Sequence, residues 1–66
     1  MTENMKIWLK NLYEEAAEDH LAAASNERLW SKGSDTDEAA MLHMQNAKEH
    51  WEFADILKEM VNDLEV

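Results

Sequence analysis

The feature that most constrains the fold is the lack of helix-breaking residues: the 66-residue chain has no proline, and its single glycine, Gly33, stands at the midpoint. Proline and glycine interrupt helices more strongly than any other residue. Alanine, leucine, glutamate, lysine and methionine, which favour helix, make up much of the rest, and β-branched residues are few. The sequence therefore predicts helix almost throughout, with one break near residue 33.

Capping residues indicate where each helix begins and ends. Thr2 is a suitable N-cap for the first helix, and Glu3 follows it at the positive end of the helix dipole. Gly33 is expected in the left-handed conformation that often ends a helix. Ser34, Asp35 and Thr36 are all N-cap types, and Asp35 with Glu38 has the spacing of a capping box, which predicts that the second helix starts near residue 36.

These signals predict an all-α fold: an antiparallel two-helix hairpin, with helices at about 3–32 and 36–64, in one domain that covers residues 1–66. With the turn near residue 33, Trp51 is predicted to lie opposite Ala16, so that a large side chain meets a small one. The runs of alanine that contain Ala16 and Ala23 would let the two backbones approach closely.

The apolar residues of the second helix fall on two faces. In the first helix, one strong stripe is expected to pack against the second helix: Met5, Leu9, Leu12, Ala16, Ala23 and Trp30. The stripe of the second helix that is expected to pack against it consists of Ala40, Met44, Ala47, Trp51, Ala54 and Val61. Its other stripe has no cover within the hairpin: Leu42, Phe53, Ile56, Met60 and Leu64. We therefore predict that two hairpins form a homodimeric four-helix bundle through these last five residues.

The small size of the chain favours the same conclusion. A single core of this size is marginal, and the usual remedies are disulfides, a metal or oligomerisation. The chain has no cysteine, which excludes disulfides and thiolate metal sites. Met1–Leu12 does not resemble a signal peptide, because it has no uninterrupted apolar segment, and no apolar run approaches about 20 residues. We therefore expect a cytoplasmic protein without membrane contact.

The net charge of −9 lies mainly in the second half: residues 34–66 hold nine acids and two bases, whereas residues 1–33 hold six acids and four bases. Direct binding to nucleic acid is not expected, because it needs clustered lysine and arginine. A basic protein would suit such a surface as a partner.

The three histidines are the candidate metal ligands. His43 and His50 are seven residues apart on one face of the second helix, and the predicted register places His20 between them. The Glu-x-x-His spacing of di-iron bundles and the zincin motif are both absent. We therefore expect hydrogen-bonded structural histidines and no cofactor, with metal binding by these three residues as the weaker alternative.

Residues 25–54 contain several short sequence motifs: SNERLWSKGS at 25–34, then His43, QNA at 45–47 and WEFA at 51–54. Through these motifs, residues 25–54 resemble small helical-hairpin proteins of unknown function from phages and prophages of Gram-positive bacteria. The resemblance implies a phage or prophage origin and brings no catalytic residue with it.

The expected function is that of a small acidic helical protein that is not an enzyme and acts through protein–protein interaction. There is no serine–histidine–acid arrangement and no glycine-rich phosphate loop. The alternative is a nucleic-acid mimic that inhibits a basic host or phage protein. It rests on four carboxylates that recur along one edge of the second helix: Glu52, Asp55, Glu59 and Asp63.

Overall fold

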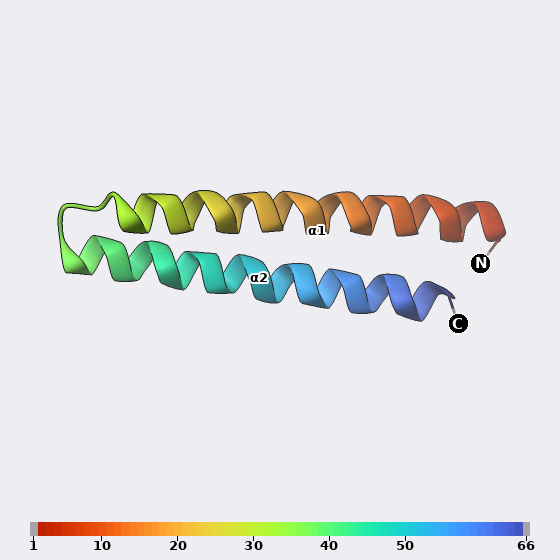
Figure 1. Ribbon diagram of the computed structural model, residues 1–66. Helices are drawn as coiled ribbons and strands as arrows, with labels where there is room; N and C mark the ends of the chain where they lie inside the picture. Colours follow the sequence, from red (N-terminus) through yellow and green to blue (C-terminus); the bar gives the residue numbers. More distant parts are fainter. Residues whose placement is uncertain (1, 66) are drawn as a thin grey trace.

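A computed structural model describes residues 2–65 and confirms the hairpin. Helix α1 spans Glu3–Lys32 and helix α2 spans Asp37–Glu65. Figure 1 shows the two helices antiparallel and side by side, with the loop at one end of a long rod and the open end at the other. No strand occurs within the described residues. The all-α prediction is therefore confirmed, with α2 displaced by one residue from the expected range.

Threonine hydroxyl groups cap the start of both helices. Thr2 Oγ1 accepts a hydrogen bond from the backbone N–H of Met5 at 3.2 Å, and Thr36 Oγ1 accepts one from the N–H of Ala39 at 3.1 Å. Each hydroxyl satisfies an N–H group that has no partner within the first turn of the helix. Of the three N-cap types predicted at 34–36, Thr36 is the one that caps α2. The capping box predicted from Asp35 is wrong, because α2 begins at Asp37.

The end of α1 also differs from the prediction. Gly33 has φ −90° and ψ 4°, so it does not adopt the left-handed conformation. Its N–H donates to the carbonyl of Leu29 at 3.1 Å, and the hydroxyl of Ser34 donates to the carbonyl of Trp30 at 2.6 Å. Because these donors satisfy carbonyl groups of the last turn, the helix ends without a left-handed residue.

The contact between the helices is built on small side chains that recur every seven residues. They are Ala17, Ala24 and Ser31 in α1 and Ala40, Ala47 and Ala54 in α2, with Val61 at the next repeat. We call this row the alanine seam. Ala24, Ala47 and Ala54 are completely buried, at 0% exposure. A seven-residue repeat keeps one face of each helix on its partner, and short side chains allow a close approach of the helix axes.

Three polar contacts cross between the helices in the half nearest the loop. They are Ser31–Ala40 at 2.7 Å, Glu27–His43 at 2.5 Å and His20–His50 at 2.9 Å. In each pair, the α2 residue lies three or four positions beyond the partner that the sequence predicted. The predicted register is therefore wrong, because the loop occupies residues 33–36 instead of being centred on Gly33.

The buried core contains no large side chain. Its members, among the described residues, are four alanines and one valine. The Cα radius of gyration is 15.3 Å, against about 11 Å for a compact domain of this length. The chain exposes 5159 Å², against about 4,300 Å² for a compact monomer of 7.7 kDa. The isolated hairpin thus leaves in water a surface that a compact domain of the same mass would bury.

The substitution Ala24→Leu should destabilise the hairpin, because a close-packed seam has no space for three additional carbon atoms. Overpacking of this kind lowers the free energy of unfolding by about 1–3 kcal/mol. The matched control is Ala22→Leu, at an exposed position two residues away, which should change it by less than about 0.5 kcal/mol. Urea unfolding followed by circular dichroism measures both values, and equal effects would contradict the seam.

Candidate interaction face

The alanine seam divides the surface of the hairpin into two sides. In an antiparallel pair, the residues that immediately precede the small residues of the seam lie on the same side in both helices. This side and its margin carry apolar residues from both helices: Met5, Leu9, Leu12, Ala16, Ala23 and Trp30 in α1, and Leu42, Phe53, Ile56 and Met60 in α2. We call these ten residues the broad face.

Two aromatic contacts orient the broad face. The ring of Phe53 is stacked on that of His20, with centroids 5.2 Å apart, and the ring of Trp30 meets that of His43 edge-on at 5.8 Å. Each contact joins one helix to the other. Phe53 is nevertheless 52% exposed and Trp30 is 56% exposed. The two rings are therefore held in position while much of their surface stays exposed to solvent.

The prediction that the α1 stripe packs against α2 is wrong. Ala17 and Ala24 are buried in the seam, whereas Ala16 and Ala23, one residue earlier, are half-buried at its border. Because the seam accepts small side chains at every seventh position, the bulky members of that stripe are displaced to the broad face. Trp51 is displaced in the opposite direction, so that its predicted contact with Ala16 is replaced by the guanidinium of Arg28, 5.8 Å from its ring centroid.

Four of the five residues predicted to contact a second chain belong to the broad face and are exposed: Leu42, Phe53, Ile56 and Met60. Their contact with a second chain stays a prediction. The fifth, Leu64, is half-buried and lies beside residues of α1 at the open end. Its neighbours there are Glu3, Lys6, Ile7 and Lys10. Leu64 therefore packs within the hairpin.

The charged residues that share the helical positions of the broad face are acidic. Asp19 lies seven residues from Leu12, and Glu49 and Asp63 lie seven residues on either side of Ile56. Within the part of the chain that the structure describes, no lysine or arginine occupies these positions. The broad face is therefore an apolar surface with acidic residues at its margins.

The imidazoles of His20 and His50 point at each other. Their Nδ1 atoms are 2.9 Å apart and their ring centroids are 5.2 Å apart. The two Nδ1 atoms therefore lie between the ring centres, on the facing edges of the rings. This is the geometry of a hydrogen bond in which one ring donates and the other accepts. One Nδ1 atom therefore carries the hydrogen and the other accepts it.

The third histidine has a different partner from the one predicted. His43 Nδ1 donates to Glu27 Oε2 at 2.5 Å, because an ionised carboxylate can only accept. The Glu27 carboxylate is 14% exposed, which strengthens the contact relative to one in open water. No group of three or more potential metal ligands comes together among the described residues. The predicted position of His20 between His43 and His50 is also wrong, since His20 lies level with His50.

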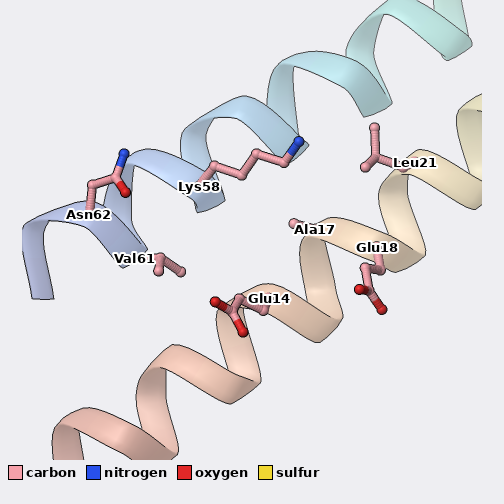
Figure 2. Close-up of a pocket in the computed structure, with 7 residues that line it drawn as sticks. All are labelled: Glu14, Ala17, Glu18, Leu21, Lys58, Val61 and Asn62. Carbon is pink, nitrogen blue, oxygen red and sulfur yellow. The ribbon is translucent and has the colours of Figure 1, made fainter. Parts of the chain in front are cut away.

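The opposite side of the hairpin carries a shallow groove with mixed charge. Figure 2 shows Glu14 and Glu18 projecting from α1 and Lys58 from α2, with Ala17 and Val61 between the two helices. Exposed apolar residues on this side, such as Ile7, Leu29 and Met41, are interspersed with charges of both signs. This side therefore differs from the broad face in carrying basic residues, such as Lys58, near its apolar ones.

The four carboxylates of the predicted acidic edge are all exposed. By their helical positions, Glu52 and Glu59 lie on the outer surface of α2, Asp55 lies on the side opposite the broad face, and Asp63 lies at the margin of the broad face. Their backbone positions follow the helix at intervals of about 5–6 Å. The arrangement places them in solvent, and their role stays a prediction.

Removing one imidazole of the histidine pair should destabilise the hairpin. We expect His20→Ala to lower the free energy of unfolding by about 1–2 kcal/mol, because a half-buried hydrogen bond and a ring contact are lost. His50→Ala should do the same, and the double variant should cost less than the sum of the two. A double-mutant cycle measured by urea unfolding isolates this coupling, and strict additivity would exclude the hydrogen bond.

Comparisons of the chain with protein-family models, curated protein sequences and solved structures found no match. The resemblance of residues 25–54 to hairpin proteins of phages and prophages stays a prediction. Neither α1 nor α2 contains, over its described residues, an apolar stretch of the length that a membrane crossing requires. The function must therefore be inferred from the geometry and chemistry of the hairpin itself.

Proposed function

We propose that this protein is a protein–protein interaction module that acts through its broad face and has no catalytic role. The observation that supports the proposal is the number of large apolar side chains that the hairpin leaves in solvent on one side, from both helices: Met5, Leu12, Trp30, Leu42, Phe53, Ile56 and Met60. Apolar side chains that gather on one side of a soluble protein often mark a binding surface.

The area of the broad face supports a stable contact. Large apolar side chains bury on the order of 150–200 Å² each, so seven of them at roughly half exposure present about 500–700 Å². A standard protein–protein interface buries about 800 Å² on each partner. The aromatic residues Trp30 and Phe53 are of the types that contribute most to binding energy.

The polar side chains of the seam support a structural role over a catalytic one. His20 and His50 bond to each other, and Glu27 bonds to His43, so each group is engaged within the hairpin. A catalytic acid or base must reach a substrate in a cleft that excludes water. The proposed role of these groups is to fix the register of the two helices.

Site-specific photocrosslinking in the cell that produces the chain tests the proposal. A photoreactive phenylalanine at position 53 should give a covalent adduct with another protein chain, because this side chain is covered in the complex. The same probe at position 41, which is 72% exposed on the opposite side, is the matched control and should give none. Equal labelling from the two positions, or no adduct from either, would count against an interaction through the broad face.

A second candidate function rests on the acidic edge. Because Glu52, Asp55, Glu59 and Asp63 are exposed along α2, we propose as the alternative that they imitate a phosphate row and occupy the groove of a basic nucleic-acid-binding protein. Immobilised chain should then retain such proteins from lysate at low salt and release them as salt rises. The charge-neutral variant of the edge, with each acid replaced by its amide, should retain none, and unchanged retention would eliminate this candidate.

A further inference from the structure

The two-helix width of the broad face points to its occupant. We propose that a second copy of this chain covers it, so that two hairpins form a four-helix bundle with their broad faces together. This inference rests on the proposed function and names the partner of the same surface. The apolar residues are divided between the helices, with Leu12 on α1 and Ile56 on α2 at neighbouring levels of the rod. A single partner helix would cover one of these rows and leave the other in water.

A second hairpin has the dimensions that the face requires. The Cα atoms extend over 51 × 14 × 10 Å, so the hairpin is a flat rod two helices wide. Two such layers placed face to face give the architecture of a four-helix bundle, in which each helix contacts two neighbours. The same patch on both copies makes the contact self-complementary, as a twofold-symmetric dimer requires.

The surface area agrees with a dimer of this kind. Each hairpin exposes 5159 Å², whereas a compact protein of twice the mass would expose about 7,200 Å² in total. The difference between two separate hairpins and such a dimer is roughly 3,000 Å², within the range of obligate homodimers. The apolar side chains of two broad faces would supply roughly 1,000–1,400 Å² of this difference, which lies at the lower end of a standard interface.

The charge of the chain predicts how such a dimer responds to salt. Each copy carries −9, and the broad face has no basic residue to attract a partner's acids. Two copies consequently repel each other at low ionic strength, while their apolar faces attract. Added salt screens the repulsion, so self-association should strengthen as salt rises. Binding to a basic protein has the opposite dependence, which separates the two kinds of partner.

Analytical ultracentrifugation of the full chain tests the inference. Sedimentation equilibrium should give a mass of twice 7.7 kDa, with a smaller dissociation constant at about 0.5 M than at about 0.05 M sodium chloride. The melting temperature should rise with protein concentration, because only the folded dimer is stabilised by mass action. A folded monomer at about 100 μM in both salts, with a concentration-independent melting temperature, would overturn the proposal.

Substitutions on the two sides of the hairpin locate the contact. Ile56→Lys should raise the dissociation constant by roughly 30-fold or more, because it places a charge in a buried interface. This change also lowers the net negative charge, so any loss of dimer cannot come from added repulsion. Met41→Lys makes the same charge change on the opposite side and should leave the dissociation constant nearly unchanged. Equal weakening by both variants would place the contact elsewhere.

The partner captured by photocrosslinking at position 53 separates this inference from the proposed function. An adduct of two identical chains supports both. An adduct with a different protein, together with a monomer in the ultracentrifuge, retains the interaction module and overturns the second copy as its partner. The absence of any adduct, together with a stable monomer, overturns both.

Discussion

The close contact of two helices along a row of alanines is the constraint on which the rest of the structure depends. Ala24 and Ala47 are completely buried, and the register brings them level with each other. A methyl group fills little volume, so this seam contributes little apolar burial to the stability of the hairpin. Its consequence is geometric: large side chains do not fit between the helices and must lie beside the seam.

The seam has two chemically different halves. Near the loop, His20–His50 and Glu27–His43 alternate with the alanines, and towards the open end Leu57 and Leu64 occupy the equivalent positions. Alanines alone would pack almost equally well after a slip of seven residues, whereas a hydrogen-bonded pair is satisfied in one alignment only. The polar half thus selects the register, and the apolar half adds burial.

The sequence was sufficient to predict the hairpin because its local signals agree. The helix boundaries follow from Thr2, Gly33 and the absence of proline. The residues of α1 that contact α2 could not be predicted from these local signals. An apolar stripe predicts that one face of a helix is buried, but it does not identify the element that buries it. The stripe that contains Leu12 and Trp30 is the more hydrophobic one, but the residues of α1 that pack against α2 are Ala17 and Ala24 beside it. The repeat of small residues every seven positions was the signal that would have identified the seam.

The packing of the helices on alanines leaves large apolar side chains exposed, and this exposed surface is available for association. The roughly 500–700 Å² of apolar surface on the broad face would correspond to on the order of 15 kcal/mol of gross stabilisation if a partner covered it. Association consumes part of that amount through lost translational, rotational and side-chain freedom. The gross value still equals the entire stability of a typical small domain. An alanine seam therefore makes a helical hairpin whose shape is set within the chain, while large apolar side chains such as Phe53, Ile56 and Trp30 stay exposed and contribute little to its stability.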